Sequence, residues 1–180
     1  MLKKVPVKEI EKLGGNLRTT AFLKECLADA LIKLLKEKPI EKITIPEISE
    51  LSGVGRTTYF RNFTSKKEML TFKLVQLWDR WAQEQELKEC KDFSLNNSFS
   101  FFQFNYNIKN LLELIYDRNL QNVVYDAFYI VMMPQSGNNA LECYKSRFYS
   151  YGLFGLLDEW IKRGFYESPE EITELVKHIV

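Results

Sequence analysis

Two short helical patterns meet at a glycine turn between residues 44 and 70, and no other feature constrains the fold of this chain as strongly. Thr44 and Glu47, three residues apart, form a capping-box pattern at the start of the first helix. Apolar residues then recur at helical spacing as far as Gly53. The turn Gly-Val-Gly at residues 53–55 opens the second helix. The segment is therefore predicted to fold as a helix-turn-helix.

The second helix carries side chains of the types that contact DNA. We expect Tyr59, Phe60 and Phe63 to anchor one face of this helix. Arginine bonds guanine through two hydrogen bonds, threonine offers a methyl group to thymine, and Asn and Thr bind phosphates or base edges. The residues left to meet DNA in this way are Arg56, Thr57, Thr58, Arg61 and Asn62.

Residues 17 to 73 resemble the tetracycline-repressor (TetR) family of bacterial regulators. The resemblance runs from the long helical pattern at 17–36 through the glycine turn to Ser-Lys-Lys-Glu at 65–68, which looks like the start of the family's linking helix. It implies a homodimer whose helix at 56–62 enters the major groove of a palindromic operator, and a separate helical domain that senses a small molecule. The residues expected at the DNA are Thr44, Gly55, Arg56, Thr57, Thr58, Tyr59, Arg61, Asn62 and Lys66.

The sequence departs from the family pattern at two places. Gly55 stands where Ser or Thr is common, and Tyr59-Phe60 reverses the aromatic order that is often seen. Phe60 consequently lacks the hydroxyl with which the family usually binds a phosphate.

Charge divides the chain into two parts that have different partners. Residues 1–75 hold 15 Lys and Arg against 9 Asp and Glu, a net charge of +6, whereas residues 76–180 hold 10 against 15, a net charge of −5. A basic part suits phosphate binding, and an acidic part is repelled by DNA. We predict an amino-terminal arm with a helix-turn-helix domain at 1–65, and a helical ligand-sensing and dimerisation domain at 66–180.

Helical patterns account for the rest of the chain, which is predicted to be all-α. Helices are expected at 17–37, from Ser65 with a second capping box toward residue 89, in two pieces between 108 and 133, and at 140–163 before Gly164. Ser168-Pro169 should begin a final helix, and 134–139 reads as a loop. Residues 1–15 form a basic arm that is either a solvated terminus or a contact to the DNA backbone or minor groove.

The middle of the chain is unusually aromatic. These residues either form a core of large side chains or line an effector cavity, because ligand pockets are mostly apolar. Residues 93–108 contain no charge, so the ligand of such a cavity should be apolar or aromatic and oriented by Tyr, Asn or Gln. The expected cavity residues are Trp78, Trp81, Phe101, Phe104, Tyr116, Tyr125 and Phe128.

The helix at residues 148–161 is apolar around its whole circumference. Its own domain can cover only part of that surface, so a second chain is expected to cover the rest, although a fully buried helix in a monomer core remains an alternative. The resemblance also places the family's dimer interface here. The expected interface residues are Tyr151, Gly152, Phe154, Gly155, Leu157, Trp160 and Ile161.

Composition argues against catalysis, a metal site and a cofactor. The one histidine, His178, leaves almost no material for triads or zinc sites, and no phosphate-cradling glycine motif occurs. Widely spaced Cys26, Cys90 and Cys143 fit a reducing compartment. Neither a signal peptide nor a membrane span is expected. The sequence thus indicates a cytoplasmic, ligand-responsive repressor that recognises a DNA sequence. A protein of the same fold that organises DNA or binds a protein partner without small-molecule control is the alternative.

Overall fold

The computed structural model describes residues 7–85, 95–132 and 139–179, and the regular elements in these ranges are all helices. The chain divides into two compact units, Met1–Lys73 and Leu74–Val180. The division falls within a helix rather than at residue 65, where the sequence placed it.

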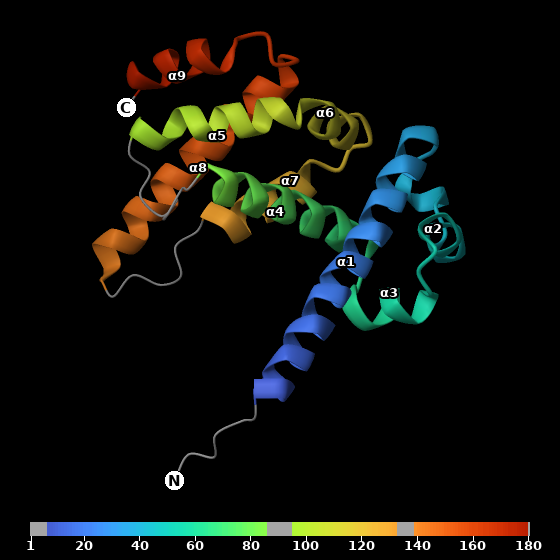
Figure 1. Ribbon diagram of the computed structural model, residues 1–180. Coiled ribbons are helices and arrows are strands. Elements are labelled where there is room, and N and C mark those ends of the chain that lie inside the picture. The colour runs from blue at the N-terminus through green and yellow to red at the C-terminus, as the bar shows by residue number, and fades with distance from the viewer. Residues whose placement is uncertain (1–6, 86–94, 133–138, 180) are drawn as a thin grey trace. The chain divides into compact units, whose positions relative to one another are not determined.

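The first unit contains α1 (Val7–Glu37), the short 3-10 helix η1 (Ile40–Lys42), α2 (Ile45–Ser52), α3 (Arg56–Asn62) and the first turns of α4 (Lys66–Glu84). Helices α2 and α3 pack against α1 and against each other (Figure 1). Their apolar faces meet in a core that includes Leu27, Leu31, Ile48, Tyr59 and Met69, each 5% exposed or less. This core holds the helix-turn-helix.

Helix α1 is longer than the sequence pattern indicated. It begins at Val7 and runs through Gly14 and Gly15, where the arm was expected to end. Each glycine costs about 1 kcal/mol in a helix, but extending an existing helix adds a hydrogen bond per residue without a new nucleation cost. The remainder of the predicted arm, residues 1–6, lies outside the described ranges.

The predicted capping patterns differ in outcome between α2 and α4. At α2 the Thr44 hydroxyl accepts from the Glu47 amide at 3.4 Å, and the Glu47 carboxylate accepts from the Thr44 amide at 2.8 Å, so the capping box is complete. At α4 the Ser65 hydroxyl accepts from the Glu68 amide at 3.1 Å, but the Glu68 carboxylate accepts from the Thr64 amide instead, at 2.6 Å. The second predicted box is therefore only half formed.

The second unit contains the rest of α4, α5 (Leu95–Asn107), α6 (Lys109–Asp117), α7 (Gln121–Met132), α8 (Ala140–Lys162) and α9 (Pro169–Lys177). Helix α5 packs against α9, and α6 packs against both α7 and α8 (Figure 1). The predicted break between α6 and α7 is present, as are Gly164 after α8 in the left-handed conformation (φ +69°) and the Ser168 capping box that begins α9.

Helix α4 ends at Glu84, before the predicted end near residue 89. Residues 86–94, which include Cys90, lie outside the described ranges, and so does most of the predicted 134–139 loop.

Candidate nucleic-acid interface and internal cavity

The turn between α2 and α3 contains two glycines with different roles. Gly53 has φ +68°, a left-handed backbone conformation that is strained for most residues other than glycine. Gly55, the N-cap of α3, has φ −62° and ψ 144°, which any residue adopts, and a Cβ built there meets no atom within 4 Å. The turn therefore requires glycine at 53 but not at 55, where a capping side chain is missing.

One face of α3 is open to solvent. Arg56, Thr57, Phe60 and Arg61 are exposed, and their spacing places them on one side of the helix. Thr58 and Asn62 are half-buried, and the Asn62 amide donates to the Thr58 carbonyl at 2.7 Å. The four exposed side chains thus form a surface of two guanidinium groups, one hydroxyl and one aromatic ring.

The two residues of the reversed aromatic pair, Tyr59 and Phe60, have opposite environments within α3. Tyr59 is 5% exposed and its ring lies in the core, whereas Phe60 is 69% exposed. The expectation that Phe60 anchors the helix is wrong, because successive helical positions are rotated by about 100° and only Tyr59 and Phe63 face α1 and α4. Burial, with the charge of Glu68 as a smaller cause, raises the pKa of the Tyr59 hydroxyl.

Thr44 and Lys66 flank the motif and have structural partners of their own. Thr44 is exposed and caps α2. The Lys66 ammonium donates to the carbonyl oxygens of Ile40 and Ile43, the latter at 2.6 Å. Lys66 therefore ties the segment before α2 to the start of α4, and any bond to a phosphate must share its ammonium with these carbonyls.

A second structural tie lies at Glu47, whose carboxylate forms an ion pair with Lys38. The hydrogen bond from Lys38, followed by those from Thr44, lowers the pKa of Glu47 to about 2. The charged form of Glu47 consequently stabilises both the α2 cap and the chain segment after α1.

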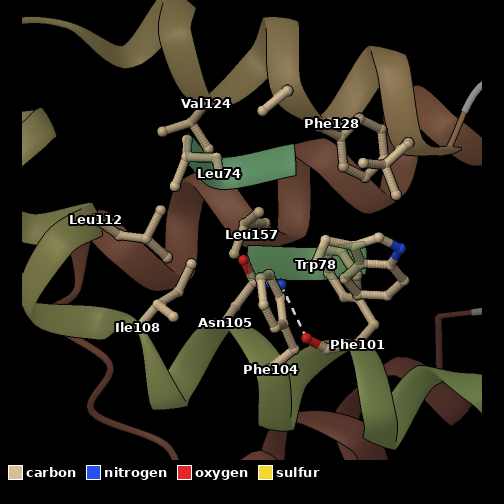
Figure 2. Close-up of a pocket in the computed structure, with 12 residues that line it drawn as sticks. Leu74, Trp78, Phe101, Phe104, Asn105, Ile108, Leu112, Val124, Phe128 and Leu157 are labelled. Atoms are coloured by element: carbon tan, nitrogen blue, oxygen red, sulfur yellow. Dashed lines mark hydrogen bonds between the residues drawn. The ribbon is translucent and has the colours of Figure 1, made fainter. Parts of the chain in front are cut away.

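A cavity of about 40 Å³ lies inside the second unit (Figure 2). Residues of α4, α5, α6, α7 and α8, with Ile108 at the α5–α6 junction, line it. Aromatic rings form much of its wall: Trp78 and Phe104 meet edge to face at 5.0 Å between centroids, and Phe101 meets Phe128 at 6.1 Å. The lining residues are Leu74, Trp78, Phe101, Phe104, Asn105, Ile108, Leu112, Val124, Ala127, Phe128, Val131 and Leu157.

Four of the seven predicted cavity residues line this space, namely Trp78, Phe101, Phe104 and Phe128. Trp81 lies outside the lining, 6.4 Å from the Phe104 ring. Tyr116 instead donates to Asp158 at 2.7 Å, and Tyr125 bonds the Tyr151 hydroxyl at 2.9 Å. The rotation of each helix about its own axis decides which of its side chains reach the cavity. In a segment with aromatic residues on all sides, the spacing of the residues does not indicate that rotation.

The sequence prediction missed Asn105, a polar residue on the cavity wall. It is 4% exposed, and its amide nitrogen donates to the Phe101 carbonyl at 2.8 Å. Its signal in the sequence was a polar position within an aromatic run, Phe-Asn-Tyr at 104–106.

The predicted dimer residues separate into buried and exposed groups. Leu157, Trp160 and Ile161 are at most 4% exposed, so they belong to the core of their own chain and cannot supply exposed interface surface. Trp160, for example, packs on Phe102 and Phe165.

The remaining predicted positions lie nearer the surface. Phe154 is half-buried against Tyr125 and Phe128, while Tyr151, Gly152 and Gly155 are exposed. Of the predicted positions, one aromatic ring and two glycines thus lie on the exposed surface of α8, where Leu141, Tyr144 and Phe148 are exposed as well.

Two further observations concern metal-binding sites and membrane-spanning helices. Among the described residues, no group of three or more His, Cys, Asp or Glu side chains is placed to hold a metal ion. No helix in the same ranges is both long and apolar enough to cross a bilayer.

Comparison with known proteins matches both parts of the chain to regulators. Residues 27–71 match the family described as bacterial regulatory proteins, tetR family, and residues 94–180 match a transcriptional regulator C-terminal region. A probable serine/threonine-protein kinase from Dictyostelium discoideum is 36% identical over 62 residues, which is 33% of this chain. The chain spans only 4% of the length of that kinase, so this similarity does not bear on activity.

Proposed function

We propose that this chain, which belongs to the tetR family of bacterial regulatory proteins, is a repressor that a small molecule releases from DNA. That it is a DNA-binding transcriptional regulator follows from the family. Repression, ligand control and action in the cytoplasm are the proposed parts. The observation that carries them is that one helix, α4, begins in the DNA-binding unit and then supplies two residues, Leu74 and Trp78, to the cavity wall of the second unit.

The proposed DNA-reading surface is the open face of α3. Arg56, at the first position of the helix, suits a bidentate contact to guanine in the major groove. The exposed Thr57 offers its methyl group to a thymine methyl group. Arg61 and the basic charge of the first 75 residues add sequence-independent attraction to phosphates.

The proposed route from cavity to DNA is helix α4. At its start Lys66 holds the carbonyls of Ile40 and Ile43, and farther along Lys73 forms ion pairs with α1. The next residue, Leu74, and Trp78 line the cavity. A ligand that prefers a wider cavity would favour a different placement of these two residues, and it would weaken DNA binding by the ratio of its affinities for the two states.

A homodimer on a palindromic site is the proposed assembly. The surface available for it is the exposed face of α8 together with the exposed apolar residues of the last turns, Leu175 (51% exposed) and Ile179 (66% exposed). A two-fold interface pairs the same patch on both protomers, which would present two α3 helices to two half-sites.

Selection of bound sequences from a random DNA pool tests the proposal. We expect enrichment of one inverted repeat whose half-sites are roughly one helical turn, about 10 base pairs, or a multiple of it apart. Binding to the selected site should exceed binding to bulk DNA at every salt concentration, although both fall as salt rises. Equal, salt-sensitive binding of all sequences would contradict a sequence-specific repressor.

A DNA-organising or protein-binding protein of the same fold is the second candidate. The size of the cavity favours it, since about 40 Å³ is well below the roughly 300–1,000 Å³ of ordinary ligand pockets. This candidate predicts that DNA affinity stays constant whatever small molecule is added. Loss of affinity for the selected site on adding a compound that binds the second unit would exclude it.

A further inference from the structure

We propose that the cavity of the second unit binds a small, uncharged, single-ring molecule that donates one hydrogen bond to the carboxamide oxygen of Asn105. The binding step is inferred from the residues that line the cavity. Its regulatory consequence, release of DNA, rests on the function proposed above.

The orientation of the Asn105 amide is determined by its hydrogen bond. Only the nitrogen can donate to the Phe101 carbonyl, which lies 2.8 Å away, so the oxygen occupies the other side of the group. In Figure 2 that oxygen is on the side of Leu157, on the cavity wall. It accepts no hydrogen bond from the described residues.

Asn105 is 4% exposed, and its carboxamide oxygen does not belong to the fully buried, unpartnered polar atoms of the described residues, so it keeps some surface open to the cavity. A ligand that filled the cavity without donating to this oxygen would desolvate it, at a cost of about 1–3 kcal/mol. A water on this oxygen finds few further partners, because the other cavity-lining side chains are apolar or, at Trp78, an indole, whereas an ordered buried water makes two to four hydrogen bonds. A ligand with one donor and an otherwise apolar surface satisfies this wall better than water does.

Charge on the ligand is disfavoured by the same wall. None of the twelve side chains drawn around the cavity is ionisable. An ammonium or carboxylate inside it would have no counter-charge, and the desolvation cost of an unpaired ion exceeds the gain from burying a small molecule. The ligand class is therefore neutral.

The aromatic wall and the volume define the ligand further. Trp78, Phe101, Phe104 and Phe128 present ring edges and faces, which favour a planar ring in edge-to-face contact. The cavity of about 40 Å³ admits only a small compound, and even a single ring must displace some lining side chains. A phenol has the required ring, donor and neutrality.

Phenol and fluorobenzene provide the test, because they are close in size and differ in the donor. Binding of both to the full chain is measured by calorimetry, in the parent and in Asn105→Leu. We expect the ratio of phenol affinity to fluorobenzene affinity to fall roughly threefold to tenfold in the variant, the range of one net hydrogen bond. The exposed Asn122→Leu on α7 is the matched control and should leave the ratio unchanged.

A measurement on the parent protein covers the case in which Asn105→Leu does not fold. The side-chain amide resonances of Asn105 should shift on adding phenol and much less on adding fluorobenzene. Three results would each overturn the proposal. They are an unchanged ratio of phenol to fluorobenzene affinity in Asn105→Leu, Asn105 amide resonances that do not shift on adding phenol, and an affinity for benzoate as high as that for phenol.

Release from the selected DNA site is measured separately. If phenol binds through Asn105 while DNA stays bound, the site stands and ligand control by this cavity is wrong. If the affinity ratio is insensitive to Asn105 but a different compound releases DNA, the repressor stands and the Asn105 site is wrong.

Discussion

Lys73 of α4 places its ammonium nitrogen 2.8 Å from a carboxylate oxygen of Glu25 on α1, with both side chains largely buried. Asp29, one turn farther along α1, lies 2.7 Å from the same ammonium but is 46% exposed. The pairing joins α4 to α1 within the first unit through one cation and two anions of unequal burial.

Glu25→Gln should lower the free energy of unfolding more than Asp29→Asn does. Removing the buried anion leaves the Lys73 ammonium with one half-exposed partner, and we expect a loss of about 1–3 kcal/mol, less than the 3–5 kcal/mol of a fully buried pair. Asp29→Asn should cost roughly 0–1 kcal/mol, as surface pairs do. Urea denaturation of both variants measures the difference. Equal losses would show that burial does not separate the two carboxylates.

Arg56→Ala should weaken binding to the selected DNA site by about 1–3 kcal/mol and relax the preference at one base position in each half-site. The exposed Lys67→Ala is the control, since loss of a phosphate contact should weaken all sequences alike. Lys66→Ala should also weaken all sequences alike, but its bonds to Ile40 and Ile43 mean that it should lower stability as well. Competition binding against single-base variants of the site reads out the preference. Parental affinity and selectivity in Arg56→Ala would remove the base-reading role.

Phe60→Tyr should tighten DNA binding modestly and for every sequence. The Phe60 ring is 69% exposed, so the added hydroxyl reaches solvent without disturbing the core and becomes available to a phosphate. The expected gain is roughly 0.5–1.5 kcal/mol, the net value of a hydrogen bond. Affinity is compared for the selected site and for bulk DNA. A gain confined to the selected site would indicate a base contact, contrary to this prediction.

Gly155→Arg should yield a monomer that is at least as stable as a parental protomer. A side chain at Gly155 meets no atom of its own chain within 4 Å, and replacing a helical glycine gains about 1 kcal/mol in helix propensity. An arginine on each side of a two-fold contact would, however, be buried without a partner. Sedimentation at micromolar concentration reads out assembly, with Asn122→Arg on α7 as control. A persistent dimer would place the interface elsewhere.

Acid should loosen the α2 cap between about pH 4.5 and 2. The pKa of Glu47 is lowered from 4.5 to about 2 by Lys38 and Thr44, so its contribution is fully present above the unfolded pKa. Protons bind the unfolded chain more readily in this window, and the contribution is lost as pH falls through the folded pKa. Glu47→Gln should remove this part of the pH dependence, which chemical denaturation at several pH values measures. An unaltered acid slope in Glu47→Gln would contradict the assignment.

Local patterns in the sequence were enough to predict the helix-turn-helix and most helix ends. The Thr44 and Ser168 capping boxes, Gly53 and Gly164 act through hydrogen bonds and backbone conformations within a few residues, so the residue types at those positions determine the outcome. The resemblance of residues 17 to 73 to TetR regulators likewise depended on local motifs, and the family matches bear it out.

Tertiary packing alone decided which apolar and aromatic side chains became core, cavity wall or surface. Phe60 and Trp160 are both aromatic residues on helices, yet one is 69% and the other 1% exposed. In helices that are apolar on several sides, spacing cannot indicate which side meets a neighbour. The Asn105 acceptor gained its place at a cavity only because α4, α5, α6, α7 and α8 surround it. That enclosure depends on contacts between residues far apart in the chain, whereas caps and turns depend on adjacent ones.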